Sequence, residues 1–310
     1  MLNNKDLSPL VSVVVISYNS GKYIEETLDS IYNQSYENIE LIISDDGSAD
    51  NTVLLANNWL EQKKQRFVNS AVLEVIENTG ISSNLKRGIV SSSGEWIKSI
   101  AADDILTPDC VETYIAAANN SSEECFISNL TVLQDGKLSD YTVWQKYVDE
   151  FDALSVAQKS MYYTINSIFL HTPSLFLKRN LFDRFRLIDE KYKLLEDQPL
   201  FFGLLRNGIN IVLLKAVTVI YRKHDSNLTV TASKGFLKNL DMAFDEYKKP
   251  VLETFFLGKV LIFLHNQNYK KSIKQKPSRL DREILKFYGI LTSLIYKYLI
   301  QLIIKNKFKK

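Results

Sequence analysis

The chain has 310 residues, of which 45% are hydrophobic and 24% are charged. This composition excludes a largely disordered or collagen-like protein, and the length is enough for one large domain or two small ones. Because Cys110 and Cys125 are the only cysteines, the sequence also excludes a disulfide scaffold and any metal site built of cysteine alone.

The formal net charge of +2 conceals an uneven distribution of charge along the chain. Residues 269–310 carry twelve Lys and Arg but only two acidic residues, a net charge of +10, which leaves −8 for residues 1–268. An acidic body is a poor clamp for nucleic acid, so we expect no nucleic-acid partner, whereas the basic end suits an anionic surface. The first residues form no apolar segment, so we expect no secretory signal.

Apolar runs alternate with helical patterns in the first third of the chain. β-Branched and apolar runs predict strands at residues 11–17, 39–44, 71–76 and 94–100. Apolar residues at helical spacing predict helices at residues 23–34, from 52 to about 64, and 82–90. This alternation predicts an α/β fold with a mixed, mainly parallel sheet flanked by helices. Ligands of such sheets bind beyond the carboxyl ends of the strands.

The remainder of the chain is less regular. Strands are predicted at residues 125–133, 173–178, 211–214 and 217–222, and helices at 108–119 and 196–206. Residues 138–170 are rich in Tyr and Trp and favour no element. After about residue 233 the pattern is helical, with Pro250 as a break. The last predicted helix, 280–305, is amphipathic, and its wide apolar face comprises Ile284, Phe287, Tyr288, Leu291, Leu294, Ile295, Tyr298, Leu302 and Ile303.

Polar side chains follow three of the predicted strands. Tyr18 follows the first strand, and Asp46 lies in the turn after the second. A carboxylate there can accept hydrogen bonds from a nucleotide base, or it can simply form a turn before a helix. Asp103 and Asp104 end the fourth strand. Adjacent carboxylates repel each other and need a cation, hydrogen bonds or solvent, so the pair could bind a divalent cation. The alternative to a cation site is a solvated helix cap.

Two more polar clusters come later in the sequence. Glu196 and Asp197 begin a predicted helix, where the helix dipole favours acids and where a general base could be held rigidly. Arg222 and His224 follow the last predicted strand. Arg can meet phosphate and His can ligate a metal, although an isolated His is more often structural.

Taken in order, seven segments between about residues 10 and 225 resemble the inverting family 2 glycosyltransferases of GT-A fold, of the bacterial surface-polysaccharide or O-antigen type. The matching residues are 11–19, 28–35, 42–50, 78–97, 103–108, the pair 196–197, and 221–224. The metal motif of that family is often Asp-x-Asp, and here its first position is Ala102.

The resemblance implies transfer of a sugar from a nucleotide-diphosphate sugar, expected to be a UDP-sugar, to a hydroxyl of a saccharide acceptor with inversion. It implies that Asp46 binds the base, with Tyr18 near the ring, and that Asp103 contacts the ribose or the sugar or assists the metal. It also implies that Asp104 ligates Mg²⁺ or Mn²⁺ and that His224 is a further contact to the metal or to the diphosphate.

The resemblance further implies that Asp197 is the catalytic base, with Glu196 and Arg222 as supporting candidates. Such a base would take the proton of the acceptor hydroxyl during attack, a contribution of about 10²–10⁴ in rate.

The predicted organisation has three parts. Residues 1–107 are the expected nucleotide-sugar-binding half and residues 108–230 the acceptor-binding half of one GT-A domain, with acceptor contacts expected in 138–172. Residues 231–310 are the expected helical C-terminal extension. Its basic amphipathic end, residues 280–310, predicts peripheral binding to the cytoplasmic face of the plasma membrane, or packing on protein. The first alternative would suit a polyprenyl-diphosphate-linked acceptor.

Other nucleotide-binding classes lack their motifs in this chain. Neither the Gly-x-Gly-x-x-Gly of dinucleotide-binding enzymes nor a P-loop is present. A sugar nucleotidyltransferase would open with a Gly-rich, Lys- or Arg-bearing loop, which is also absent. The alternative function that stays open is a non-catalytic nucleotide-sugar-binding or scaffold protein of the same fold.

Overall fold

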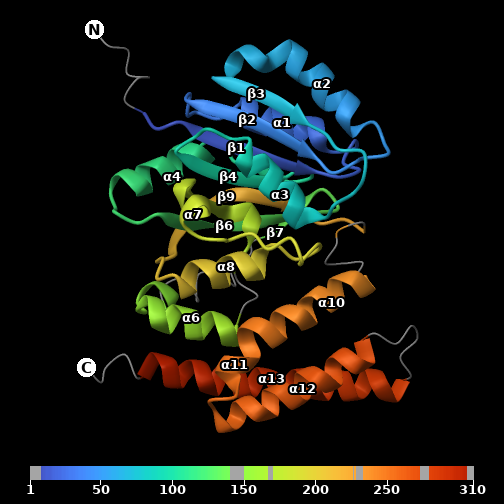
Figure 1. The fold of residues 1–310 in the computed structure, drawn as a ribbon, viewed down its shortest axis with the longest axis vertical. Coiled ribbons are helices and arrows are strands. Elements are labelled where there is room, and N and C mark those ends of the chain that lie inside the picture. Colours follow the sequence, from blue (N-terminus) through green and yellow to red (C-terminus); the bar gives the residue numbers. More distant parts are fainter. Residues whose placement is uncertain are drawn as a thin grey trace. The chain divides into compact units, whose positions relative to one another are not determined.

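The computed structural model describes residues 8–139, 150–166, 170–225, 227, 233–272 and 279–305. The chain divides into two compact units, Met1–Asp152 with Leu170–His224, and Ala153–Phe169 with Asp225–Lys310. In Figure 1 the strands belong to the first unit, and the described part of the second is helical. Helix α6 (Val156–Ile165) therefore belongs with the C-terminal helices.

A nine-stranded mixed sheet with the order β3-β2-β1-β4-β8-β6-β9-β5 is the centre of the first unit, and β7 pairs with β6. Its strands β1 to β4 are mutually parallel, β8 is antiparallel to β4 and β6, and β9 is parallel to β6. The predicted α/β fold with a mainly parallel sheet is thereby confirmed. The strands are β1 (Val11–Ser17), β2 (Ile39–Asp45), β3 (Asn69–Leu73), β4 (Trp96–Ala101), β5 (Ile105–Leu106), β6 (Cys125–Gln134), β7 (Lys137–Ser139), β8 (Leu175–Lys178) and β9 (Val212–Arg222).

Helices cover both faces of this sheet, which is why every residue of β1 and β2 is buried. Apolar side chains of α1, α2 and α4 pack on one face, and α3 contacts β1 and β2 from the other. The α3 backbone approaches the sheet closely at Gly88, where an added Cβ would lie 2.4 Å from Val14 Cγ1. The helices of this unit are α1 (Ile24–Tyr32), α2 (Thr52–Lys63), α3 (Ile81–Val90), α4 (Cys110–Asn119), α7 (Asn180–Arg184) and α8 (Asp197–Arg206).

Two strand predictions differ from the structure. The strand predicted at 71–76 is observed at Asn69–Leu73, two residues earlier at its start and three at its end. Ile76 is 99% exposed, because the chain has left the sheet there and covers the turn after β2. The two strands predicted at 211–214 and 217–222 are one strand, β9, whose pairing with β6 shifts register at Ser128 and Asn129. An irregularity of this kind interrupts the regular pattern of a strand, so the sequence pattern predicted two strands where the structure has one.

The second unit contains α6, α10 (Lys234–Ala243), the π-helical turn Phe244–Lys248, α11 (Lys249–Leu252), α12 (Phe256–Ser272) and α13 (Arg279–Lys305). Pro250 lies in the first turn of α11, where a missing N–H is tolerated. Helix α13 packs on α12 and α6. None of the described helices combines the length and the apolar character needed to cross a lipid bilayer.

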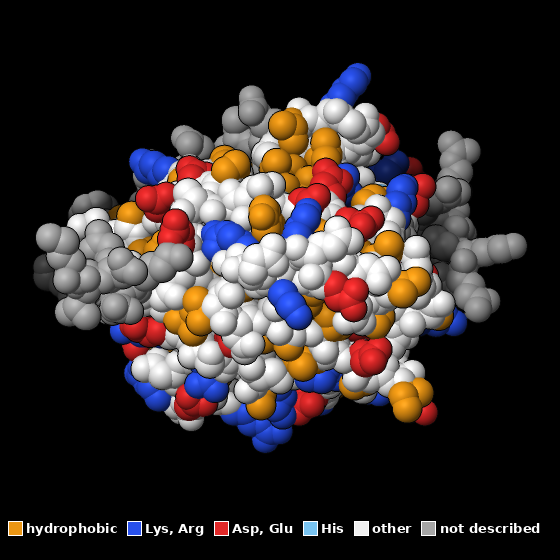
Figure 2. Space-filling view, turned by 90° about the horizontal axis from the view of Figure 1, so that it is seen from above, with side chains coloured by type: hydrophobic (Ala, Val, Ile, Leu, Met, Phe, Trp, Pro, Cys, Tyr) orange, Lys and Arg blue, Asp and Glu red, His pale blue; other side chains and the backbone are white. Residues whose placement is uncertain are grey.

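Charges of both signs are interspersed on the face seen from above in Figure 2. The described side chains of that face therefore form no broad field of one sign. A polyanionic ligand that bound this face would be attracted by individual Lys and Arg side chains and not by a broad positive field.

Candidate active site

Tyr18, Asp46 and the Asp103–Asp104 pair follow the carboxyl ends of three parallel strands, β1, β2 and β4. Strands β2 and β4 flank β1, so their ends lie on the same edge of the sheet. The Asp46 N–H donates to the Ser17 carbonyl (3.0 Å), and the Ala102 N–H donates to the Ile16 carbonyl (3.0 Å). The chain after β2 and the chain after β4 are thus both attached to the end of β1.

The loop after β1 is held by the turn after β2. Asn19 has a positive φ of 51°, its N–H donates to Ser48 Oγ (2.7 Å), and its side-chain oxygen accepts from the Ala49 N–H (2.8 Å). Tyr18 remains 49% exposed at this edge. An exposed aromatic side chain of this kind can stack on a nucleotide base, and the role that the family resemblance implies for Tyr18 stays a prediction.

Asp46 is 2% exposed, and its carboxylate already has protein partners. It accepts hydrogen bonds from the Thr79 N–H (3.1 Å to each oxygen), the Thr79 hydroxyl (2.6 Å) and the Gly80 N–H (2.7 Å). Arg87 of α3 adds an ion pair at 3.1 Å. Asp46 therefore joins the end of β2 to the start of α3, and its predicted contact with a base stays a proposal.

Replacing Asp46 with Ala is expected to lower the free energy of unfolding by about 3 kcal/mol, because several buried donors and Arg87 lose their acceptor. Urea unfolding followed by tryptophan fluorescence measures this change. The control is Asp183→Ala, which removes an exposed carboxylate from α7. If the Asp46→Ala variant were as stable as the wild-type protein but had lost nucleotide binding, Asp46 would act only by contacting the nucleotide and not by stabilising the fold.

Asp103, Asp104, Arg222 and His224 form one cluster in the structure. The His224 Nε2 lies 2.9 Å from Asp103 Oδ2. The Arg222 N–H donates to Asp104 Oδ1 (2.9 Å), and its Nε donates to the Asp103 carbonyl (2.9 Å). The end of β9 therefore holds the turn that follows β4.

Asp104 is the least satisfied member of this cluster. It is 1% exposed, and its Oδ2 has no hydrogen-bond partner in the part of the chain that the structure describes. Burial, followed by the charge of Asp103, raises the pKa of Asp104 well above its usual range. Such a carboxyl needs a cation or a proton, and the orphaned oxygen suits a hard divalent cation.

The cluster supplies few ligands for such a cation. Within the described residues, no group of three or more His, Cys, Asp or Glu side chains could hold a metal ion. A cation at Asp104 would therefore take most of its ligands from phosphate oxygens and water, which is how Mg²⁺ is commonly bound.

Three residues of α1 and its N-cap complete the cluster, and sequence reasoning did not find them. Tyr23 stacks on His224, with ring centroids 4.9 Å apart, and the Arg222 guanidinium lies 4.9 Å from the Tyr23 centroid. Glu26 forms an ion pair with Arg222, and the Thr27 hydroxyl donates to the Asp104 carbonyl (2.7 Å). Their helical pattern alone gave no sign of these contacts, because the partners lie some 80 to 200 positions away.

Glu196 and Asp197 lie at the N-terminus of α8, as predicted. Asp197 is the first helical residue, and its Oδ1 accepts from the Gln198 N–H (2.6 Å). Burial, followed by the negative charge of Asp197, raises the pKa of Glu196 to about 7. The pair therefore holds one acid that titrates near neutral pH, which is a useful property in proton transfer.

The segment before α8 packs beside the residues that hold Asp46. The Ser82 hydroxyl donates to the Tyr192 carbonyl (2.6 Å). Gly80, at φ 97°, passes so close to Lys193 that an added Cβ would lie 2.5 Å from its carbonyl oxygen. This contact places the start of α8 near the turn bound by Asp46 and shows why Gly is needed at position 80.

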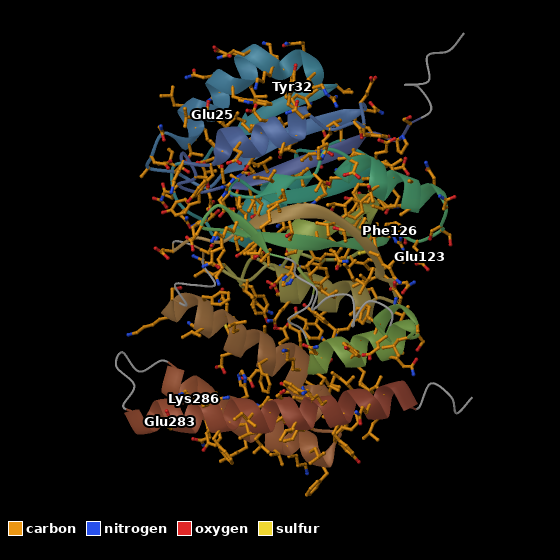
Figure 3. The ribbon with its side chains drawn as sticks, turned by 180° about the vertical axis from the view of Figure 1, so that it is seen from behind. Glu25, Tyr32, Glu123, Phe126, Glu283 and Lys286 are labelled. Carbon is orange, nitrogen blue, oxygen red and sulfur yellow. The ribbon has the colours of Figure 1, made fainter. Side chains whose placement is uncertain are left out.

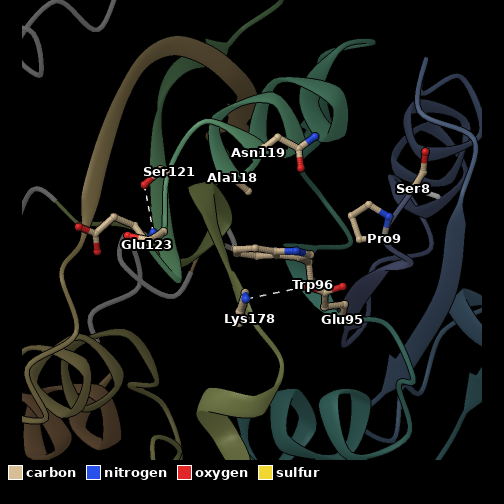
Figure 4. A pocket seen from close by; sticks show the side chains of 10 residues that line it. Ser8, Pro9, Glu95, Trp96, Ala118, Asn119, Ser121, Glu123 and Lys178 are labelled. Carbon is tan, nitrogen blue, oxygen red and sulfur yellow. Dashed lines mark hydrogen bonds and ion pairs between the residues drawn. The ribbon is translucent and has the colours of Figure 1, made fainter.

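A separate cavity of about 430 Å³ lies at the other edge of the sheet. Figure 4 shows Trp96, Lys178, Glu95 and Glu123 among the residues that line it. Trp96 begins β4, whereas Asp103 and Asp104 follow its end. This cavity is therefore not part of the acidic site.

Two comparisons of the sequence with known proteins agree on the family. The family model for glycosyl transferase family 2 matches residues 12–186. An uncharacterized glycosyltransferase of Rickettsia prowazekii is 27% identical over 303 residues, which are 93% of this chain and 91% of that protein. A putative glycosyltransferase of Bacillus subtilis, EpsH, is 34% identical over 146 residues, 46% of this chain and 40% of that protein.

Solved structures share the fold at low sequence identity. S. aureus TarS in complex with UDP-GlcNAc matches with a TM-score of 0.59 at 15% identity, covering 95% of this chain and 83% of that one. A mannosyltransferase from Pyrobaculum calidifontis, in complex with GDP-Man and Mn²⁺, matches with a TM-score of 0.59 at 18% identity, covering 98% and 88%. Since the family model spans more than half of the chain, and its fold is that of GT-A transferases, the protein belongs to glycosyl transferase family 2 and is a glycosyltransferase.

Proposed function

We propose that this glycosyltransferase transfers a sugar from a nucleoside-diphosphate sugar, with UDP as the expected nucleotide, to a hydroxyl of a saccharide acceptor with inversion. The observation that carries the proposal is the Asp103–Asp104 turn at the carboxyl edge of the sheet, where Asp104 Oδ2 is buried and has no hydrogen-bond partner among the described residues. Structural neighbours that hold UDP-GlcNAc, or GDP-Man with Mn²⁺, support it.

The donor diphosphate needs positive charge, because the surrounding cluster is rich in carboxylates. Asp104 would hold a divalent cation, Mg²⁺ or Mn²⁺, with His224 and Asp103 beside it. When bound, such a cation acts as a Lewis acid that stabilises charge on the leaving diphosphate. Arg222 keeps the Asp103–Asp104 turn in place through the contacts of its backbone and side chain.

In this proposal Asp197 is the base of the reaction. Its carboxylate takes the proton from the acceptor hydroxyl as that oxygen attacks the anomeric carbon and the bond to the diphosphate breaks. A single displacement of this kind inverts the anomeric centre. The N-terminus of α8 holds Asp197 rigidly for this role, and Glu196, with its raised pKa, modulates the charge of the pair.

The nucleotide would lie along the loops after β1 and β2. Tyr18 is an exposed aromatic side chain there, and the ion pair of Asp46 with Arg87 joins the turn after β2 to α3. We further propose a polyprenyl-diphosphate-linked saccharide as the acceptor, in assembly of a cell-surface polysaccharide such as O-antigen at the cytoplasmic face of the plasma membrane. This part of the proposal depends on the basic C-terminal helix rather than on the acidic site.

The test combines binding and hydrolysis. Thermal shifts are measured with UDP-, GDP- and dTDP-sugars, each with and without Mn²⁺, and release of nucleoside diphosphate is followed on the same samples. We expect a UDP-sugar to raise the melting temperature only with Mn²⁺ and to be hydrolysed slowly. Binding without any turnover, even with saccharide acceptors, would favour the non-catalytic binding protein instead. Absence of any shift would contradict the proposed donor class.

A further inference from the structure

Helix α13 has two apolar faces, and the described residues cover only one of them. Ile295, Leu299 and Ile303 are at most 8% exposed, and the Ile303 carbonyl accepts a hydrogen bond from Gln158 of α6 (3.4 Å). The single wide apolar face expected from the sequence is therefore divided by packing. A second set of large apolar side chains is between 39% and 62% exposed, namely Phe287, Ile290, Leu294, Tyr298 and Leu302.

These exposed residues form one stripe along the helix. They follow one another at intervals of three or four positions, which places them on one side of an α-helix. We call them the outer stripe. Lys286 and Lys297 lie beside it and, with Ile290, Ser293 and Leu294, line a shallow groove. Figure 3 shows Lys286 next to Glu283, with which it forms an ion pair at 3.0 Å.

The charge of the segment decides what could cover the outer stripe. Residues 269–310 carry a net charge of +10, so a second copy of the chain seated on the stripe would bring two strongly positive segments together. An anionic lipid surface has the opposite charge and accepts apolar side chains at the same time. A transmembrane position is not available to any described helix.

We propose that the outer stripe of α13 inserts into the interface of an anionic lipid bilayer, with Lys286 and Lys297 placed among the headgroups. The helix lies along the surface and does not span it. This proposal does not rest on the proposed sugar transfer, and it names the surface on which a lipid-linked acceptor would be presented.

The experiment measures sedimentation of the full-length protein with vesicles of phosphatidylcholine, with or without phosphatidylglycerol. Wild-type protein is expected to bind the vesicles that contain phosphatidylglycerol. Leu294→Glu is expected to lower the partition coefficient at least tenfold, because it places a charge in the apolar stripe. Lys297→Gln should lower it about fivefold, in a manner that disappears at high salt.

The matched control is Leu54→Glu, which makes the same substitution at a side chain of α2 that is 61% exposed and lies outside the stripe. We expect it to bind vesicles like the wild-type protein. The proposal would be overturned if Leu294→Glu bound vesicles as strongly as the wild-type protein. It would also be overturned if the only change in this variant were dissociation of a dimer, measured by sedimentation velocity. Nucleotide-sugar hydrolysis, measured in the same samples without vesicles, reports separately on the proposed function.

Discussion

Replacing Asp197 with Asn is expected to lower kcat about 10²–10⁴-fold and to leave donor affinity unchanged. Asn keeps the shape of Asp197 and can still accept the Gln198 N–H, but it cannot take a proton from the acceptor hydroxyl. Steady-state kinetics with the best donor and acceptor measure kcat, and thermal shift with the donor measures affinity. A loss confined to kcat is the expected signature of a group that acts only in the transition state.

Two further variants separate this role from a general effect of charge. Asp183→Asn removes an exposed carboxylate from the same unit and should leave kcat unchanged. Glu196→Gln should change the pH profile instead. The Glu196 pKa of about 7 means that the carboxyl is neutral below that pH and charged above it, so the wild-type profile should change slope near pH 7 and the variant profile should not. Near-normal turnover of Asp197→Asn would remove Asp197 from the mechanism.

Replacing Asp104 with Asn is expected to abolish the Mn²⁺-dependent part of donor binding and to lower kcat/KM by at least about 10². The variant keeps an oxygen for the Arg222 N–H, so the turn after β4 should persist, but the charge that would hold a cation is lost. Isothermal titration with UDP, with and without Mn²⁺, measures the first effect. Initial rates with a UDP-sugar measure the second.

A control five residues further along the chain, after β5, makes the Asp104 result specific. Asp109 precedes α4 and accepts a hydrogen bond from the Thr107 hydroxyl (2.8 Å), so Asp109→Asn changes a nearby exposed carboxylate. It should bind UDP and Mn²⁺ like the wild-type protein. If Asp104→Asn retained full Mn²⁺-dependent binding, the cation would have to be held elsewhere, and the proposed role of the buried oxygen would be wrong.

Local pattern accounts for much of the first unit. The β-branched run at Val11–Ser17 predicts its strand with the bounds observed, and the runs before Asp46 and Asp103 predict β2 and β4 to within one or two residues at each end. Such runs are buried on both faces of a parallel sheet, so their composition alone indicates a strand. The order of the polar segments indicated the resemblance to the family. Several of these segments come directly after predicted strands, so their place at the ends of the strands could also be predicted.

Side-chain partners could not be predicted in the same way. The sequence pattern places Asp46 in a turn, and only the fold shows that Thr79, Gly80 and Arg87 contact it. The pattern likewise places Arg222 at the end of a strand, and only the fold shows that it contacts the Asp103–Asp104 turn. These contacts join residues that are distant in sequence. Their geometry depends on strand order and on the close approach at Gly80, neither of which is encoded by local spacing.

The last helix shows the same division. Its amphipathic character, its length and its positive charge are properties of the sequence, because helical spacing and composition need no partner to be recognised. Which apolar residues are covered depends on α6 and α12, which pack on α13, where Ile295, Leu299 and Ile303 are buried. Burial is a property of the packed chain, so only the tertiary structure could separate the inner face of α13 from the outer stripe.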